Sequence, residues 1–411
     1  MKGIFVIADG LGGRPTDLNG NTCLEAAETP YLDALATRGA LGLVDPIGPG
    51  IRPGSDTAHL SLLGYDPFKV YTGRGVFECL GMGMDVQAGD ICFRANFASV
   101  ESSAEGLRLL DRRAGRISEG QNELEDALRA LSVPGAEIEF LASTQHRGAL
   151  RIRGEGLSRF IGETDPHEVG TVLLASRPTQ DVPGADKTAD IVNQMTQQSF
   201  EILRDLPLNK KRVAAGQLPA NVLLVRGAAN CPVLPSIESV IGARGAVIAG
   251  GALYRGVAEA CGMDYIPVQG ATGGLDTNIK AKAAAILRTL EDYDYVFCHL
   301  KGTDNAGHDK NAADKKAFIE RMDSELFKVL IERVDWGRTH LAFTGDHCTP
   351  IDYGDHTVDP VPVLFVGPNI PRDPGTTFGE RVAGQGGLGR FSGRVLPMLL
   401  GYCNWAPKFG S

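Results

Sequence analysis

Four short segments of the chain carry side chains that could hold a pair of divalent metal ions. They read ADGLGG around Asp9, GSDTAH around Ser55, TDNAGHD after residue 302, and TGDH followed by DH after residue 343. Their carboxylates and imidazoles are Asp9, Asp304, Asp346, His308, His347 and His356. Mn²⁺ and Zn²⁺ accept both ligand types, and two such ions can clamp a phosphoryl group during its transfer. The residue types therefore predict two-metal phosphoryl-transfer chemistry.

Ser55 is the candidate nucleophile of this chemistry. It follows Arg-Pro-Gly, so Gly54 can form a sharp turn and a helix can begin at Ser55. A helix start gathers backbone N–H donors and the positive end of the helix dipole, which suits a phosphate on that serine. The alternative is an ordinary N-cap serine without a chemical role.

The elements that must position these residues alternate between strand and helix. Asp9, Asp304 and Asp346 each follow a predicted strand, at residues 3–7, 295–300 and 340–344. Further predicted strands are 246–249, 265–268 and 363–366, and predicted helices are 24–38, 252–261, 278–290 and 312–333. This order predicts an α/β fold with a mostly parallel sheet, whose carboxyl edge is where ligands bind.

The middle of the chain has a different pattern. Short β-like pieces at residues 91–98, 137–141 and 149–152 and one helix at 191–204 predict an inserted α+β domain. We place the metal-binding core at residues 1–80 and 239–411, and the inserted substrate-binding or lid domain at 81–238. The crossing segments are expected near residues 73–83 and 232–244, where Gly and Pro are frequent.

Charge and hydropathy exclude several classes of protein. The chain has 411 residues with 41 basic and 50 acidic side chains, a net charge of −9. No long run of either sign occurs, which argues against a nucleic-acid partner or a polybasic membrane anchor. The N-terminus lacks the apolar stretch of a signal peptide, and no segment is apolar enough to span a membrane. We expect a cytoplasmic protein, and the sequence does not indicate its oligomeric state.

The motifs together resemble the archaeal-type, cofactor-independent phosphoglycerate mutases of the alkaline phosphatase superfamily. The resemblance rests on ADGLGGRP, RPGSDTAHLSLLGYDP, DRRAGRI, LKGTDNAGHD, TGDHCTP and DHTVDPVPVLF, and it extends to GGLGR near the C-terminus. It implies an alkaline-phosphatase-like core with an inserted domain. It also implies interconversion of 3-phosphoglycerate and 2-phosphoglycerate in glycolysis and gluconeogenesis, without 2,3-bisphosphoglycerate.

The resemblance also implies roles for matching residues. Asp304, His308 and His356 would hold one ion, and the other would be held by Asp9, Ser55, Asp346 and His347. Ser55 would form the phosphoserine intermediate. The ions would be Mn²⁺, Zn²⁺ or Mg²⁺, and the partner would be a small phosphorylated acid.

Recognition of the substrate carboxylate and proton transfer require further groups. The candidates are Asp165 as a base, with His146, Arg147, His167 and Arg226 from the insertion and Lys280 from the core. For each of these residues the alternative is a surface salt bridge without a role in catalysis. The same alternative applies to Arg112, Arg113 and Arg116.

Two other functions use the same site chemistry. One is a related phosphotransferase resembling a homoserine kinase, and the other is a metal-dependent phosphomonoester hydrolase. A metal-binding regulatory protein without turnover is a third alternative, against which the presence of a nucleophile and a full ligand set argues.

Overall fold

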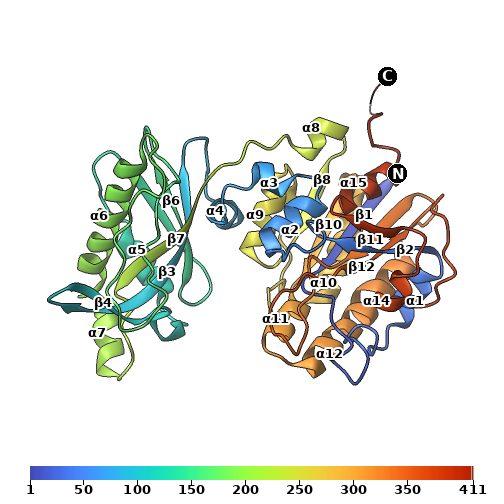
Figure 1. Cartoon of the computed structure of the whole chain (residues 1–411), viewed down its shortest axis with the longest axis horizontal. Helices are drawn as coiled ribbons and strands as arrows, with labels where there is room; N and C mark the ends of the chain where they lie inside the picture. The colour runs from blue at the N-terminus through green and yellow to red at the C-terminus, as the bar shows by residue number, and fades with distance from the viewer. Residues whose placement is uncertain (409, 411) are drawn as a thin grey trace. The chain divides into compact units, whose positions relative to one another are not determined.

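The computed structural model describes residues 1–408 and residue 410, and it divides into two compact units. The first, here the outer unit, comprises Met1–Tyr71 and Leu234–Ser411, and the second, here the inserted unit, comprises Thr72–Val233. Figure 1 shows that each has a sheet of its own. The observed boundaries fall after residues 71 and 233. They lie nine and five residues before the boundaries proposed from sequence, which fall after residues 80 and 238. The role of the inserted unit as a lid stays a prediction.

The outer unit is built on an eight-stranded sheet of order β13-β2-β12-β11-β1-β10-β8-β9. Its central strands are β1 (Lys2–Ala8), β10 (Tyr295–Leu300), β11 (Thr339–Thr344) and β8 (Gly245–Ile248). Strand β1 pairs in parallel with β10 and β11, and β10 pairs in parallel with β8. The α/β class with a mostly parallel sheet is thereby confirmed.

The other strands make the sheet mixed. They are β2 (Gly39–Asp45), β12 (Val361–Val366), β13 (Gly389–Ser392) and β9 (Asp264–Tyr265). Strand β12 runs antiparallel to both β11 and β2, whereas β13 is parallel to β2. The predicted strand at 265–268 is wrong in its extent, because Pro267 has no N–H to continue the ladder beyond the bond from Ile266 N to Val247 O of 2.9 Å.

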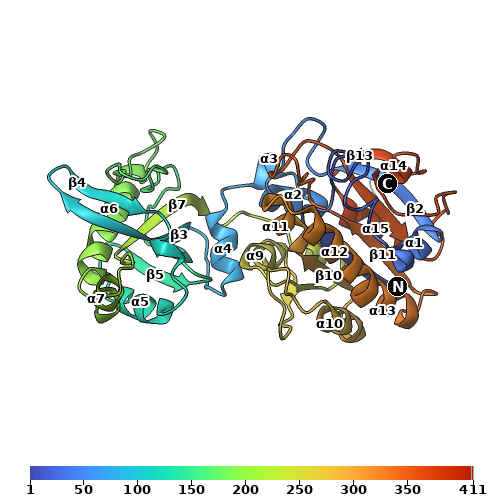
Figure 2. The ribbon, with the colours of Figure 1, turned by 90° about the horizontal axis from the view of Figure 1, so that it is seen from below.

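Helices cover both faces of this sheet (Figure 2). One core cluster joins alternate residues of β1, β10 and β11 to α1 (Pro30–Ala36), α10 (Ile279–Asp292), α12 (Ala312–Met322) and α13 (Lys328–Arg333). On the opposite face, α15 (Val395–Tyr402) packs on β1 and β11 and α9 (Ala252–Ala260) on β8. The remaining helices are α2 (Ser55–Leu62), α3 (Pro67–Val70), α8 (Ile237–Ile241), α11 (Gly302–His308) and α14 (Glu380–Ala383).

One predicted helix starts later than expected, and another keeps its predicted limits but contains a π-helical segment. The helix predicted at 24–38 begins only at Pro30, because proline disfavours helical backbone at the residue before it, and Thr29 has φ −126° and ψ 56°. The helix predicted at 312–333 is interrupted by a π-helical segment, η2 (Asp323–Phe327), between α12 and α13. Asp323, the first residue of η2, caps the start of α1. Its Oδ1 accepts from Leu32 N at 2.7 Å and its Oδ2 from Tyr31 N at 3.3 Å.

The inserted unit contains an antiparallel sheet of order β4-β3-β6-β5, with β7 also paired to β3. The strands are β3 (Ile91–Ser103), β4 (Gly106–Asp111), β5 (Glu137–Ala142), β6 (Arg147–Arg153) and β7 (Val222–Asn230). Its helices are α4 (Gly75–Gly81), η1 (Ala114–Arg116), α5 (Gln121–Leu128), α6 (Ala185–Leu203) and α7 (Pro207–Ala214). A separate hydrophobic cluster forms its core, including Phe93, Leu150 and Val192. Within the residues that the structure describes, no helix in either unit is long and apolar enough to cross a membrane.

The cap of α1 can be tested by the substitution Asp323→Ala. Thr29, the N-cap residue, makes no side-chain cap bond, so the two backbone N–H groups depend on Asp323. We expect the free energy of unfolding to fall by about 1–3 kcal/mol, measured by urea denaturation, because buried donors lose their acceptor. The exposed Asp292→Ala variant is the control and should change stability by less than about 0.5 kcal/mol. Equal stability of both variants would show that the cap contributes nothing.

Candidate metal centre

Three neighbouring strands of the outer unit bring the candidate carboxylates to one edge of the sheet. Strand β1 lies between β10 and β11, and the three run in the same direction. Asp9 directly follows β1, and its backbone N donates to Leu300 O at the end of β10 at 2.8 Å. Asp304 lies in α11 just after β10, and Asp346 lies two residues after β11. All three side chains are buried.

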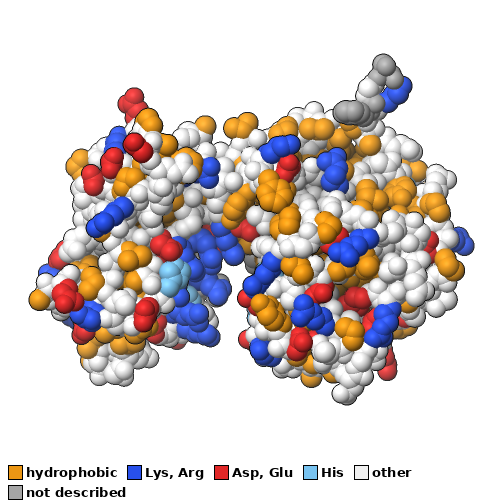
Figure 3. All heavy atoms as spheres, viewed as in Figure 1, with side chains coloured by type: hydrophobic (Ala, Val, Ile, Leu, Met, Phe, Trp, Pro, Cys, Tyr) orange, Lys and Arg blue, Asp and Glu red, His pale blue; other side chains and the backbone are white. Residues whose placement is uncertain are grey.

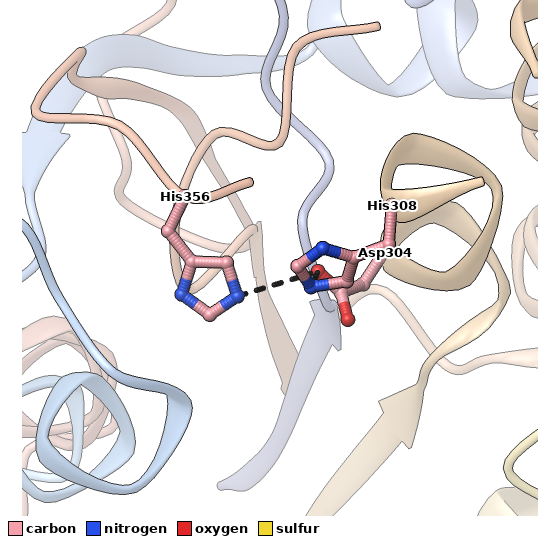
Figure 4. A group of neighbouring side chains, drawn as sticks. All are labelled: Asp304, His308 and His356. Carbon is pink, nitrogen blue, oxygen red and sulfur yellow. Dashed lines mark ion pairs between the residues drawn. The ribbon is translucent and has the colours of Figure 1, made fainter. Parts of the chain in front are cut away.

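The first group of candidate ligands is Asp304, His308 and His356, whose side chains point toward one another in Figure 4. Asp304 Oδ1 lies 3.3 Å from His308 Nε2 and 3.6 Å from His356 Nε2. His308 Nδ1 donates to Gly354 O at 3.0 Å, and His356 Nδ1 donates to Pro53 O at 2.8 Å. These backbone bonds leave both Nε2 atoms as lone-pair donors toward the same point, as in a metal-binding histidine pair.

The second group converges on one nitrogen, His347 Nε2. Asp9 Oδ1 lies 3.4 Å from it, Asp346 Oδ2 3.3 Å and Ser55 Oγ 3.3 Å. The ring is held from its other side, where Nδ1 is 3.1 Å from Thr349 Oγ1. The His347 ring also stacks on that of His356 with centroids 3.5 Å apart, so the two groups of candidate ligands adjoin each other.

Ser55 is the first residue of α2, after an extended Gly54 at the N-cap position. Only 7% of Ser55 is exposed, and Gly54 has no side chain with which to cap this helix end, although Asp56 Oδ1 accepts from Thr57 N at 2.9 Å. The positive end of the helix dipole therefore acts at the serine itself, where it favours a bound anion.

The donor set fits divalent cations. Asp9 Oδ1 and Asp346 Oδ2 are buried and have no hydrogen-bond partner. A buried carboxylate oxygen without a partner is costly, and a cation removes that cost. The pKa values also indicate a lack of positive charge at this site. Burial and the charge of Asp9 raise the pKa of Asp346 to about 7. Burial opposes protonation of His347, but Asp346 and Asp9 raise its pKa to about 9.

Sequence reasoning missed four side chains that surround these ligands. They are His59, His299, Lys301 and Thr349. His299 Nε2 and Lys301 Nζ each lie 3.1 Å from Asp9 Oδ2, and His59 Nδ1 donates to Ser55 O at 2.6 Å. A usable signal existed, because Lys301 stands inside the LKGTDNAGHD motif and His59 inside GSDTAH.

In the inserted unit, Asp165 is buried and paired with Arg112. The guanidinium donates to both carboxylate oxygens, with Nε–Oδ1 at 2.9 Å and Nη2–Oδ2 at 2.7 Å. Burial opposes ionisation of Asp165, but Arg112 and the backbone N–H of His167 lower its pKa. This pairing disfavours Asp165 as a base, and favours a role in orienting Arg112. His167 lies in the same network, with Nδ1 2.8 Å from Arg112 Nη2.

The other predicted substrate-binding residues are in different settings. Arg226 lies in β7 opposite Arg94 of β3, and its Nε is buried without a hydrogen-bond partner. His146 Nδ1 is also buried without a partner, and burial together with Arg147 lowers the pKa of His146 to about 4. Arg147 opens β6 with an exposed side chain, and Lys280 is exposed in the first turn of α10 in the outer unit. Figure 3 shows Lys and Arg side chains gathered beside a histidine on the inserted unit.

Metal binding at this centre should strengthen as the pH rises. A cation must displace the protons that Asp346 and His347 hold below pKa values of about 7 and about 9. We expect the affinity of EDTA-treated protein for Mn²⁺, measured by calorimetry, to rise at least about tenfold between about pH 6 and about pH 8.

The variant His347→Gln should bind Mn²⁺ more weakly and with a shallower pH dependence, because one displaced proton is gone. His167→Gln in the inserted unit is the control and should retain the full pH dependence. An affinity independent of pH would contradict the assignment of these two groups as ligands.

Several known proteins resemble this chain over its full length. Residues 36–209 match the family model described as 2,3-bisphosphoglycerate-independent phosphoglycerate mutase. The chain is 46% identical to a protein of that name from Archaeoglobus fulgidus, with 100% of both chains covered, and 45% identical to one from Ignicoccus hospitalis, with 100% of this chain and 99% of that one covered. Among solved structures, a protein from Pyrococcus horikoshii is 37% identical with a TM-score of 0.87, covering 100% of this chain and 99% of that one.

A second solved structure is described as a cofactor-independent phosphoglycerate mutase from Thermoplasma acidophilum. It is 34% identical with a TM-score of 0.71, covering 98% of this chain and 100% of that one. The full-length similarity confirms the resemblance of the motifs: the chain belongs to the enzyme family of 2,3-bisphosphoglycerate-independent phosphoglycerate mutases.

Proposed function

We propose that this phosphoglycerate mutase moves the phosphoryl group between 3-phosphoglycerate and 2-phosphoglycerate through Ser55, at a centre of two divalent ions. The observation that carries the proposal is the convergence of Ser55 Oγ, Asp9 Oδ1 and Asp346 Oδ2 on His347 Nε2, each within 3.4 Å. Buried carboxylates and an imidazole around a hydroxyl are the surroundings expected of a nucleophile that a metal ion activates. The reaction would serve glycolysis and gluconeogenesis.

We assign separate ligands to the two ions, with Asp304 between them: one of its carboxylate oxygens also lies within 4.8 Å of the ligand atoms of Asp9 and His347. Asp304, His308 and His356 would hold one ion, and Asp9, Asp346, His347 and Ser55 the other. Bound Mn²⁺, Zn²⁺ or Mg²⁺ would lower the pKa of the Ser55 hydroxyl and offset the charge of the phosphoryl group. The mixed imidazole and carboxylate set favours Mn²⁺ or Zn²⁺ over Mg²⁺ alone.

Ser55 forms and breaks the bonds to phosphorus. Its Oγ bonds to phosphorus as the bond from phosphorus to the substrate oxygen breaks, and the Ser55 proton passes to that oxygen, giving glycerate and phosphoserine. The other hydroxyl of glycerate then takes the phosphoryl group, and its proton returns to Ser55 Oγ. The start of α2 supports this step, because the helix dipole favours the dianionic phosphate on its first residue.

The inserted unit would recognise the substrate carboxylate. Arg226 has a buried Nε without a partner, and Arg112 is oriented by Asp165. A guanidinium binds a carboxylate with two parallel hydrogen bonds, which suits a glycerate that must stay bound while it reorients. Retention of glycerate and exclusion of water are needed, because water would otherwise hydrolyse the phosphoserine.

The nucleophile is tested by Ser55→Ala. We expect conversion of 3-phosphoglycerate to 2-phosphoglycerate, coupled to enolase and assayed with Mn²⁺ but without 2,3-bisphosphoglycerate, to fall by at least about 10⁴-fold. Ser61→Ala in the same helix is the matched control and should retain activity. Quenched wild-type enzyme should yield a phosphorylated Ser55 peptide by mass spectrometry.

Turnover by Ser55→Ala would exclude the phosphoserine route. If metal-loaded wild-type enzyme released free phosphate instead of isomerising the substrate, a phosphomonoester hydrolase would be the better assignment. Transfer of phosphate from ATP to homoserine would instead identify a kinase-like enzyme.

Carboxylate recognition is tested by Arg226→Ala. Loss of a charged donor should raise the KM for 3-phosphoglycerate about 10- to 100-fold, because a hydrogen bond between charged groups contributes about 1.5–3 kcal/mol. Arg129→Ala is the matched control, since Arg129 is exposed and paired with Asp126 at 3.1 Å. An unchanged KM would remove Arg226 from the substrate site.

A further inference from the structure

Lys301 lies between the two groups of candidate metal ligands. It follows β10 directly and precedes α11, at the carboxyl edge of the sheet. Its Nζ donates to Asp9 Oδ2 at 3.1 Å and to Asp304 Oδ2 at 2.7 Å. The side chain is 24% exposed, whereas both carboxylates are buried.

The two oxygens of Asp9 have different surroundings. Oδ2 receives the hydrogen bonds from Lys301 and, at 3.1 Å, from His299 Nε2. Because a carboxylate oxygen can only accept, His299 donates from Nε2 in this contact. Oδ1 receives no hydrogen bond and lies 3.4 Å from His347 Nε2.

Asp304 repeats this division. Its Oδ2 contacts Lys301, whereas its Oδ1 faces His308 Nε2 at 3.3 Å and His356 Nε2 at 3.6 Å. Thr349 Oγ1 also donates to Oδ1, at 3.0 Å. In both aspartates, then, Oδ1 faces imidazoles of the candidate metal ligands, whereas Oδ2 contacts Lys301.

We propose that Lys301 is a positioning residue that couples the two metal sites: it holds Oδ2 of Asp9 and of Asp304, and thereby presents a single oxygen of each carboxylate to its ion. The inference rests on the two-metal function proposed above. Without the ammonium, either carboxylate can rotate and present both oxygens to a cation, which raises the coordination number and changes the geometry around Ser55. Groups that orient metal ligands typically contribute 10- to 100-fold to affinity or activity.

The experiment compares metal-free wild type, Lys301→Met and Lys301→Arg, each titrated with Co²⁺ as a spectroscopic probe. The bound Co²⁺ per chain, the visible absorption spectrum and mutase kcat at saturating Co²⁺ are measured. We expect Lys301→Met to bind two equivalents, as the wild type does, with a weaker visible band and a kcat lower by about 100-fold. Lys301→Arg keeps a cationic donor and should recover the wild-type spectrum and part of kcat.

Lys316→Met is the matched control. Lys316 forms a surface ion pair with Glu320 at 2.6 Å in α12, so its removal should leave spectrum and kcat unchanged. If Lys301→Met does not fold, the same measurements on Lys301→Gln decide, with the same expected loss of band intensity.

The outcomes separate this inference from the proposed function. A wild type that binds no Co²⁺ would overturn the two-metal centre itself. A wild type that binds two equivalents, with a Lys301→Met variant of unchanged spectrum and kcat, would overturn only the role of Lys301. A Lys301→Met variant with lower kcat but an unchanged spectrum would also overturn the positioning role, because the ligand geometry would then be independent of the lysine.

Discussion

The burial of three carboxylates at one edge of the parallel sheet is the constraint on which the outer unit depends. Removing an ionised carboxylate from water costs several kcal/mol even after relaxation, and like charges that share a site add to this cost. Asp9, Asp304 and Asp346 can therefore stay ionised together only if positive charge is supplied. Lys301 provides one such charge by contacting two of the three, and the unpartnered oxygens of Asp9 and Asp346 show where more is needed.

The loops that carry these residues are held by a second set of cations, which do not face the carboxylates. Lys315 is fully buried and donates to Gly12 O and to Thr349 O, each at 2.9 Å, so it ties the loop after β1 to the loop after β11. Lys282, also fully buried, donates to His299 O at 2.8 Å in β10. Each ammonium satisfies buried backbone carbonyls and so helps to fix the segments that carry the candidate ligands.

The inserted unit differs from the outer unit in its sheet and in the charge of its polar side chains. Its antiparallel sheet has its own core and carries arginines whose partners are incomplete or shared, such as Arg226 and Arg112. Guanidinium groups stay charged at any relevant pH. Burial therefore does not neutralise them, whereas a buried lysine can lose its proton. A unit of this composition is suited to anion recognition, which complements the transfer chemistry proposed for the outer unit.

Much of the candidate centre could be predicted from sequence, because ligand types and strand ends are local properties. The strands before Asp9, Asp304 and Asp346 are apolar runs of the right length, and the full-length motif pattern pointed to the family that the comparisons show. The start of α2 at Ser55 was likewise predicted, although Gly54 before it is extended, with φ −85° and ψ 155°, and does not form a sharp turn.

Tertiary structure alone decided which oxygen of each carboxylate faces which partner. Lys301 and Asp9 are 292 positions apart, and His299 and Asp9 are 290 apart, so their contacts arise only when β10 pairs with β1. The true start of α1 depends in the same way on Asp323, 291 positions beyond Leu32. Local patterns record a residue's chemistry and its place in a strand or helix. The pairing of distant segments determines which groups each side chain contacts, and in the sheet this pairing is set by the register of the strands.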